Sequence, residues 1–177
     1  MVLTVAALVV AISAAAFAAT VSGTSEADRM TGTDIRDFLD GKAGDDTISG
    51  LGGNDDLYGH LGVDTLKGGS GGDYLNGSGY EIVEGDIIED VNDKAADRLV
   101  GGTGADYLDG SLGNDTLVGG TGKDEFYGDA GDDRIFARDA SATEELIWCG
   151  SGFDRVEADA SDRVARDCER VAPLPGY

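Results

Sequence analysis

Ten aspartates recur through this sequence at intervals of nine residues, in two runs of five. They are Asp37, Asp46, Asp55, Asp64 and Asp73, then Asp97, Asp106, Asp115, Asp124 and Asp133. Carboxylates can act as an acid–base pair in glycoside hydrolysis, or they can supply the oxygen ligands that hard cations such as Ca²⁺ require. The regular spacing favours cation binding, because it makes all the positions equivalent instead of singling out two.

The residues around each aspartate repeat with it, as nonapeptides in which the aspartate takes the sixth position. The units begin at residues 32, 41, 50, 59 and 68, and again at 92, 101, 110, 119 and 128. Glycine fills the first position in nine of the ten units and the fourth position in eight. The eighth position always holds a large apolar residue: Leu39, Ile48, Leu57, Leu66, Leu75, Leu99, Leu108, Leu117, Phe126 and Ile135. Four positions kept in phase predict an ordered repeat architecture.

Each nonapeptide is expected to form a tight turn followed by a very short strand. Glycine accepts positive φ and close backbone approach, so the first six residues can curl with their carbonyl groups turned inward. Side chains alternate along a strand, which places the apolar eighth residue inside and its mostly polar neighbours outside. With half a coil in each unit, we predict an all-β fold: a parallel β-roll, or β-solenoid, with two sheets and turns stacked along both edges.

The composition supports a cation-binding chain. The sequence has 35 Asp and Glu against 13 Lys and Arg, a formal net charge of −22, and 29 glycines in 177 residues. Such a composition is typical of disordered chains, and only the strict period argues against disorder here. Self-repulsion of the carboxylates makes cations good partners, and it argues against nucleic acid and anionic membrane surfaces as partners. No protein partner can be identified from the sequence.

The repeat resembles G-G-x-G-x-D-x-U-x, the nonapeptide of the repeat-in-toxin (RTX) family, also called the haemolysin-type calcium-binding repeat. The unit Gly68–Asn76 fits this pattern at every position, and the units at Gly101 and Gly119 fit its glycine, aspartate and apolar columns. The second position departs from it in most units. The units at residues 32 and 92 also lack the fourth-position glycine, having Ile35 and Ala95. We expect these opening units to be caps with weak or half-built sites.

The resemblance implies that Ca²⁺ lies between successive turns, bound by sixth-position aspartates and by backbone oxygens of the glycine stretch. Carried over to this chain, the pairs are Asp37–Asp55, Asp55–Asp73, Asp46–Asp64, Asp97–Asp115, Asp115–Asp133 and Asp106–Asp124. That suggests on the order of six ions. Magnesium should fit poorly, because it demands near-octahedral geometry and gives up water reluctantly. We also expect calcium to drive the folding of the roll.

The ends of the chain predict export. Residues 1–18 are interpreted as a signal peptide with an A-x-A cleavage motif at Ala16–Ala18. No Lys or Arg precedes the apolar run, as one usually does in a signal peptide, so an uncleaved membrane anchor is the alternative. Apart from this segment, no membrane contact is expected, and the predicted location is extracellular. Two cysteines in an exported chain favour a Cys149–Cys168 disulfide.

These features divide the chain into six expected segments. They are a signal peptide (1–18), a linker (19–31), a first run of repeats (32–79), an insertion loop (80–96), a second run (97–136) and a C-terminal cap closed by the disulfide (137–177). The cap holds one more repeat-like unit, Cys149–Val156, with Asp154 at the aspartate position. Whether the two runs form one solenoid or two stays open at this point.

No catalytic residue is assigned, and the protein is not expected to be an enzyme. Gly68–Gly72 matches G-x-S-x-G only formally, because it lies within a repeat and lacks a strand-to-helix elbow. The one histidine, His60, is expected to be a surface turn residue. Two alternatives remain: an adhesion or ice-binding solenoid, and the repeat portion of a toxin or hydrolase. Against the first, the outward residues Phe38, Thr47, Asp56, Thr65 and Tyr74 form no uniform threonine or aromatic ladder.

Overall fold

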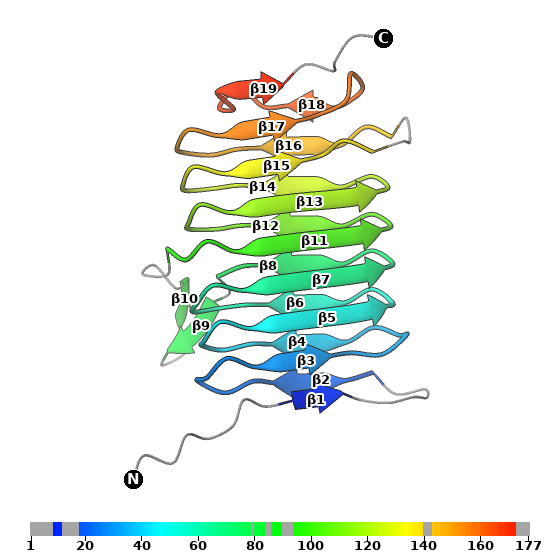
Figure 1. Cartoon of the computed structure of the whole chain (residues 1–177), viewed down its shortest axis with the longest axis vertical. Coiled ribbons are helices and arrows are strands. Elements are labelled where there is room, and N and C mark those ends of the chain that lie inside the picture. The colour runs from blue at the N-terminus through cyan, green and yellow to red at the C-terminus, as the bar shows by residue number, and fades with distance from the viewer. Residues whose placement is uncertain are drawn as a thin grey trace.

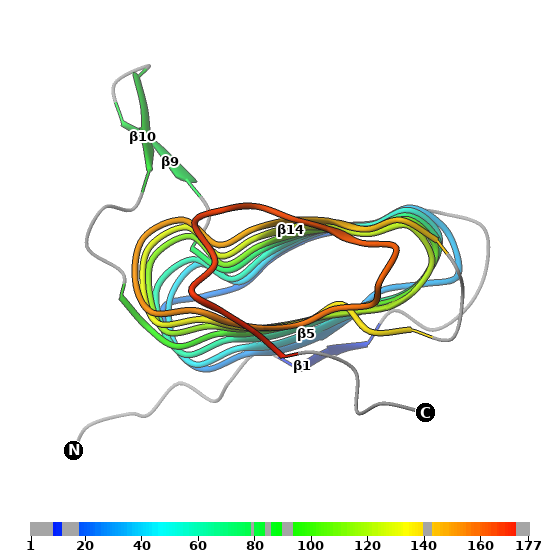
Figure 2. The same cartoon turned by 90° about the horizontal axis from the view of Figure 1, so that it is seen from above.

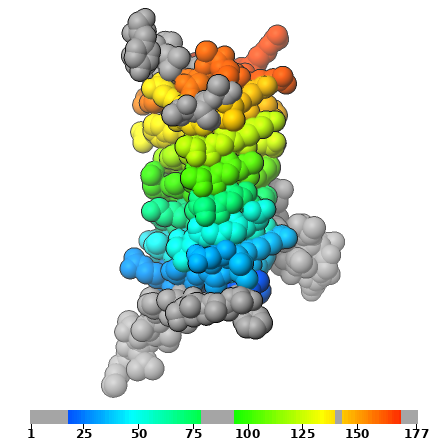
Figure 3. All heavy atoms as spheres, turned by 90° about the vertical axis from the view of Figure 1, so that its right-hand side faces the viewer, coloured from blue at the N-terminus to red at the C-terminus, as the bar shows by residue number. Residues whose placement is uncertain are grey.

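The chain forms one parallel β-roll in which the polypeptide winds upward in flattened coils (Figure 1). The computed structural model describes residues 9–11, 18–78, 80–83, 86–89, 94–139 and 143–172. Successive stretches of sequence form successive layers of the stack (Figure 3). The predicted all-β, parallel solenoid is therefore confirmed. Among the residues described, no helix is long and apolar enough to cross a membrane.

Two parallel sheets make up the broad faces of the roll, and every strand is short. The nine-stranded sheet contains, in spatial order, β1 (Val9–Ala11), β3 (Arg29–Thr31), β5 (Thr47–Gly52), β7 (Thr65–Ser70), β11 (Arg98–Thr103), β13 (Thr116–Thr121), β15 (Arg134–Phe136), β17 (Arg155–Glu157) and β19 (Arg170–Ala172). The eight-stranded sheet contains β2 (Thr20–Ser22), β4 (Phe38–Asp40), β6 (Asp56–Tyr58), β8 (Tyr74–Asn76), β12 (Tyr107–Asp109), β14 (Glu125–Tyr127), β16 (Leu146–Trp148) and β18 (Arg163–Val164).

The core is a single column of apolar side chains between the two sheets. All ten apolar residues predicted from the eighth position of the repeat are at most 1% exposed. Met30 and Ile147 extend the column beyond the repeats, with the same 1% exposure. Because each coil contributes only one such residue per sheet, the core is narrow, and the turns must supply much of what holds the coils together.

The two runs of repeats form one continuous stack, which settles the question left open by the sequence. Strand β7 pairs with β11 and β8 pairs with β12 in the same parallel register as within each run, with Leu66 opposite Leu99 and Leu75 opposite Leu108. The predicted insertion loop contains an antiparallel hairpin, β9 (Tyr80–Val83) and β10 (Asp86–Glu89). Viewed along the roll, this hairpin projects away from the coils (Figure 2).

The segment 19–31, predicted to be a linker, is part of the roll. It contains β2 and β3, which pair with β4 and β5. The sequence explains why: residues 23–31 form one more unit, with Gly23, Asp28 and Met30 at the first, sixth and eighth positions. Of the predicted signal peptide, only Ala18 and β1, which pairs with β3, lie within the described residues. Its cleavage stays a prediction.

An aromatic ladder runs along the outer face of the eight-stranded sheet, contrary to the expectation from the sequence. Six consecutive strands each contribute one ring: Phe38, Tyr58, Tyr74, Tyr107, Tyr127 and Trp148. Neighbouring ring centroids are 4.8 to 5.6 Å apart. The expectation failed because it compared the seventh positions of consecutive units, which lie in the two sheets in turn. The ladder lies on one sheet only, and its rings come from seventh positions, such as Tyr74, and from ninth positions, such as Tyr58. Tilted and stacked ring contacts of this kind stabilise the packing of one coil on the next.

The C-terminal cap continues both sheets through β16 to β19 and is closed by the predicted disulfide. The sulfur atoms of Cys149 and Cys168 are bonded, with their Cα atoms 5.1 Å apart. Cys149, directly after β16, is fully buried. The bond therefore ties the last coils together across 19 residues of sequence.

Candidate metal centres in the stacked turns

All ten predicted aspartates lie in the turns with their side chains at most 3% exposed. They form two columns, one along each edge of the roll. The first column precedes the strands of the nine-stranded sheet: Asp46, Asp64, Asp97, Asp115 and Asp133. The second column precedes the strands of the eight-stranded sheet: Asp37, Asp55, Asp73, Asp106 and Asp124. Carboxylates held so deep in a protein require partners.

One oxygen of each carboxylate connects neighbouring coils. The backbone N–H of Asp37 donates to Oδ1 of Asp55 (2.8 Å), and the N–H of Asp55 donates in turn to Oδ1 of Asp73 (2.8 Å). The structure brings together all six predicted pairs in this way. It adds two pairs across the insertion, Asp64–Asp97 and Asp73–Asp106, so that both columns run through it unbroken.

The second oxygen of most of these carboxylates accepts no hydrogen bond from the residues that the structure describes. This holds for Oδ2 of Asp46, Asp55, Asp73, Asp106, Asp124 and Asp133, and each of these atoms is buried. In the unit at Gly101, a Cβ atom on the glycine would collide with Oδ2 of Asp106 and would lie 2.7 Å from the carbonyl oxygen of Gly119 in the next coil. The first-position glycine therefore leaves space where a carboxylate oxygen and a carbonyl oxygen converge. These are the hard oxygen donors that Ca²⁺ takes.

The backbone conformation of the turns directs carbonyl groups toward the open carboxylate oxygens. The second and fourth positions both adopt positive φ, as at Gly102 (125°) and Gly104 (136°). Five second positions without glycine keep this conformation, for example Leu51 (82°) and His60 (69°), whereas Thr33 does not. A non-glycine residue is strained there. At these five positions the turn geometry thus persists although the consensus glycine is missing.

Burial raises the pKa of the stacked carboxyls. For Asp55, Asp106 and Asp133 the pKa rises to about 7, and for Asp46 and Asp124 to about 6. Loss of solvent is the main cause for all of them, and carboxylates of neighbouring residues and coils raise the pKa further, whereas the backbone N–H bond to each carboxylate lowers it. A column of ionised aspartates is therefore unfavourable by itself, and a bound divalent cation would relieve it.

The opening coils satisfy their carboxylates internally. Oδ2 of Asp37 accepts the backbone N–H of Thr33 (2.5 Å), and the Thr33 hydroxyl bonds the same carboxylate (3.1 Å). Thr24 makes the equivalent contacts to Asp28. Protein groups already occupy the oxygen that is left open in later coils. This gives a physical basis for the expectation that the unit at residue 32 is a half-built site.

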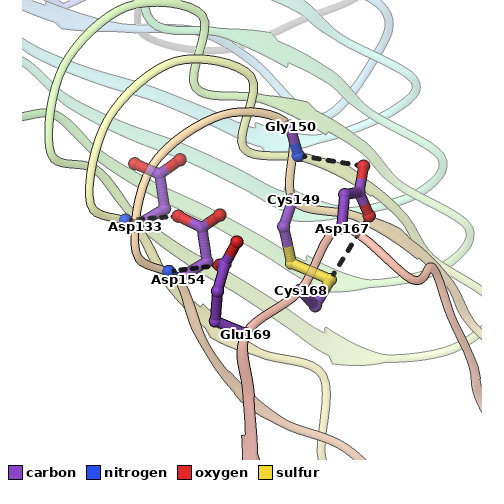
Figure 4. The surroundings of a disulfide bond; sticks show 7 residues. All are labelled: Asp133, Cys149, Gly150, Asp154, Asp167, Cys168 and Glu169. Atoms are coloured by element: carbon purple, nitrogen blue, oxygen red, sulfur yellow. Dashed lines mark hydrogen bonds between the residues drawn. A yellow bond between two sulfur atoms is a disulfide. The ribbon is translucent and has the colours of Figure 1, made fainter.

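The columns extend beyond the ten predicted aspartates at both ends. At the N-terminal end, the N–H of Asp28 donates to Asp46 (2.7 Å). At the C-terminal end, the first column continues from Asp133 to Asp154 (2.9 Å) and on to Glu169 (3.0 Å), beside the disulfide (Figure 4). The sequence had indicated Asp154 but not the others. Gly23 and Met30 could have revealed Asp28, whereas Glu169 follows a turn out of phase with the repeats.

The second column also continues into the cap, through Glu145. This side chain is 1% exposed, and its pKa is raised to about 9, mainly by burial and further by Asp162, Asp124, Asp139 and Asp159. A turn longer than a repeat turn separates it from Asp133, so the period of nine gave no indication of it.

His60 is not the surface residue that the sequence suggested. It is 7% exposed, and its Nε2 lies 3.0 Å from Oδ1 of Asp40, which also contacts Lys42. Burial opposes the ionisation of Asp40, but hydrogen bonds from His60 and Lys42 hold its pKa below the usual value. Within the described ranges, no three acidic, histidine or cysteine side chains are already arranged around a common metal position. Backbone carbonyls must therefore supply part of any coordination shell in the turns.

The sequence model of the RTX calcium-binding nonapeptide repeat matches the chain in four copies, over residues 31–66, 58–79, 93–125 and 109–140. Together these segments cover more than half of the chain and include all ten predicted aspartates. Asp28, Glu145 and Asp154 lie outside them. No curated protein matches the chain.

Proposed function

The chain belongs to the RTX calcium-binding nonapeptide repeat family, and from this premise we propose that it is an extracellular protein in which Ca²⁺ bound between stacked turns drives folding of the β-roll. The ions would be held by the sixth-position aspartates of successive coils together with backbone carbonyls of the glycine-rich turns. About six ions correspond to the six aspartate pairs within the two runs. The pair Asp37–Asp55 is expected to be the weakest, because Thr33 occupies one oxygen of Asp37.

The observation that carries this proposal is the repeated buried oxygen. In coil after coil, one carboxylate oxygen accepts a backbone N–H while the other faces a space lined by a carbonyl oxygen of the next coil. A buried carboxylate oxygen without a partner is costly, and such a cost repeated through the coils that follow the opening ones would be hard to retain unless a ligand removed it. Calcium fits because it accepts many oxygen ligands in irregular geometry, whereas Mg²⁺ demands an octahedral shell.

Folding should depend on the ion because the apolar core is narrow. Each coil buries only one large apolar residue per sheet, and the 29 glycines lose more backbone entropy on ordering than other residues. Metal that binds the stacked turns but not the unfolded chain adds its binding free energy to the stability of the roll.

Export would also shape the first coil. If the signal peptide is cleaved after Ala18, the new α-amino group belongs to Ala19, whose nitrogen lies 2.5 Å from Oδ1 of Asp37. Its positive charge would pair with the first carboxylate of the second column. Mass spectrometry of the protein secreted by a host cell tests this part. A mature chain that begins at Ala19 is expected, and retention of residues 1–18 would contradict cleavage.

Calorimetric titration of the mature protein with Ca²⁺, with Mg²⁺ as the matched control, tests the central proposal. We expect several ions, with single-site dissociation constants of about 10⁻⁴ to 10⁻³ M before cooperativity, and little heat from Mg²⁺. Far-UV circular dichroism in calcium and in excess EGTA tests the coupling to folding. A β-rich spectrum that persists in EGTA would refute calcium-driven folding, and the absence of calcium binding would refute the function itself.

A further inference from the structure

The turn between β15 and β16 buries a glutamate where a repeat turn would place an aspartate. Leu146 pairs with Glu125, and its N–H donates to the carbonyl oxygen of Asp124 (3.1 Å). Glu145 therefore occupies the position directly after Asp124 in the second column. It lies outside the four segments that match the nonapeptide family, which end at residue 140.

Glu145 differs from the aspartates of the columns in its lack of hydrogen bonds. Oε1 and Oε2 are both buried, and neither accepts a hydrogen bond from the part of the chain that the structure describes. At Asp124, by comparison, Oδ1 accepts the N–H of Asp106 (3.0 Å), and only Oδ2 is left open. Three carboxylate oxygens that accept no hydrogen bond from the described residues thus belong to two residues that follow each other along the column.

The charged groups around Glu145 cannot neutralise it. The carboxylates that act on it most strongly are those of Asp162, Asp124, Asp139 and Asp159. Backbone donors fix Asp162 in place: Oδ1 accepts the N–H of Glu145 (3.3 Å), and Oδ2 accepts the N–H of Asp159 (2.5 Å).

Two arginines of the cap, Arg138 and Arg163, are engaged with other acids. Arg163 pairs with Glu144, whose side chain is 40% exposed, and Arg138 lies 3.7 Å from Glu157. Both contacts are on the outside of the cap. Either protonation, which the raised pKa of Glu145 favours, or a cation from solution must then balance the buried carboxylate, and only a cation would also use the open oxygens of both residues.

We propose that Glu145 anchors an additional Ca²⁺ site in the cap, shared with Oδ2 of Asp124 and completed by backbone carbonyls. The inference rests on the proposed function, because it extends the second column by one ion beyond the repeats. Its donors are carboxylate and carbonyl oxygens, which suit Ca²⁺. The ion would join the cap to the last repeat on one edge of the roll, while the Cys149–Cys168 bond ties the final coils to each other.

The test compares Glu145→Gln with Glu144→Gln in the full mature chain. Both substitutions remove one carboxylate and conserve shape, but only Glu145 is buried. Calorimetry with Ca²⁺ is expected to give one ion fewer for Glu145→Gln and an unchanged number for Glu144→Gln. Circular dichroism in calcium verifies that both variants fold, and Glu145→Asp, which keeps the charge on a shorter side chain, should retain the ion with weaker affinity.

A second measurement uses Trp148, the only tryptophan, which lies three residues after Glu145 in an extended segment and so within about 10 Å along the chain. Tb³⁺ replaces Ca²⁺ and emits when a nearby indole is excited. Excitation at wavelengths where only tryptophan absorbs should give emission in the wild type and in Glu144→Gln, and strongly reduced emission in Glu145→Gln. A folded Glu145→Gln protein with unchanged ion number and unchanged emission would refute the site.

Asp106→Asn separates this inference from the proposed function. If Asp106→Asn loses ions and Glu145→Gln does not, the repeats bind calcium and the cap site is wrong. If only Glu145→Gln loses an ion, the cap site stands and the role assigned to the repeat aspartates fails.

Discussion

The substitution Asp106→Asn should change stability in opposite directions with and without calcium. Asp106 lies in the middle of the second column, 2% exposed, with Oδ1 bound by the N–H of Asp73 (2.8 Å) and Oδ2 open. An asparagine can keep the first contact through its carbonyl oxygen. It replaces the open oxygen by an uncharged amide nitrogen, so the substitution removes the buried charge and little else.

The magnitude without calcium follows from the pKa. The pKa of Asp106 is about 7 in the roll and 3.8 for a free carboxyl, so the ionised side chain destabilises the calcium-free roll by about 4 kcal/mol well above pH 7. The buried amide of asparagine costs about 1–3 kcal/mol, because a carbonyl oxygen such as that of Gly119 can accept only one of its two N–H groups. We therefore expect a net gain of about 1–3 kcal/mol in the calcium-free state.

With calcium, the same substitution should be destabilising. The introduced asparagine would withdraw an anionic ligand from the ions on either side of its coil, toward Asp73 and toward Asp124. At a calcium concentration of 100 times the dissociation constant, each lost ion removes about 2.7 kcal/mol of stabilisation. The sign of the effect therefore reverses between the two conditions.

Urea unfolding at about pH 8, followed by far-UV circular dichroism, measures both values. Calcium-free samples contain EGTA and enough trimethylamine N-oxide to populate the roll. Asp34→Asn, an exposed carboxylate on a turn, is the matched control and should change stability little in either condition. A loss of stability for Asp106→Asn both with and without calcium would refute the view that this carboxylate is a charge held for a cation.

Three further results are expected. Because the pKa of Asp55 and Asp133 is raised to about 7, the roll binds more protons than the unfolded chain between about pH 4 and pH 7. The stability of the calcium-free roll should therefore be highest below about pH 4 and fall as the pH rises to 7, whereas the affinity for calcium should rise over the same range. Urea titrations at several pH values measure the stability, and calorimetry at the same pH values measures the affinity. Gly104→Ala should destabilise the roll by several kcal/mol, since the added Cβ would overlap the carbonyl oxygen of Gly71 and Gly104 has a φ of 136°. Leu51→Gly should stabilise the roll by about 1 kcal/mol, because it relieves the positive φ of Leu51. Equal effects of the two substitutions in thermal unfolding would contradict this. Reduction of the disulfide should weaken the cap by about 3 kcal/mol and increase amide exchange after residue 149 while leaving exchange in β5 to β13 unchanged.

The period of nine predicted most of the fold because each column of the repeat has one physical task. The apolar eighth position gave the core, and the sixth position gave the two columns of buried aspartates. Where the period continued, residues such as Leu66 and Asp64 lie as expected. The spacing also predicted correctly which aspartates follow each other along an edge, since two units make one coil.

The sequence failed where stacking depends on contacts that are out of phase. The insertion at residues 80–96 hides the pairing of β7 with β11, because the register resumes only in space. The unit with Asp28 was missed because Glu26 replaces the fourth-position glycine and the unit adjoins the apolar N-terminal run. Glu145 follows a lengthened turn, and its burial depends on the neighbouring coils. Two further features appear only in the stacked turns. In the later coils one carboxylate oxygen of most aspartates is left open, and in the opening coils Thr24 and Thr33 bond the corresponding oxygen.

The hairpin β9–β10 has a consequence for how such a chain can diversify. It departs from the coil after β8 and returns before β11, yet β11 pairs with β7 as any neighbouring coil would. The turn at residues 77–96 can thus host foreign polypeptide without disturbing the architecture on either side. A peptide epitope, a reporter or a whole guest domain spliced between β9 and β10 would be displayed at mid-height on the outside of the scaffold, and its presentation could be switched by adding or chelating calcium.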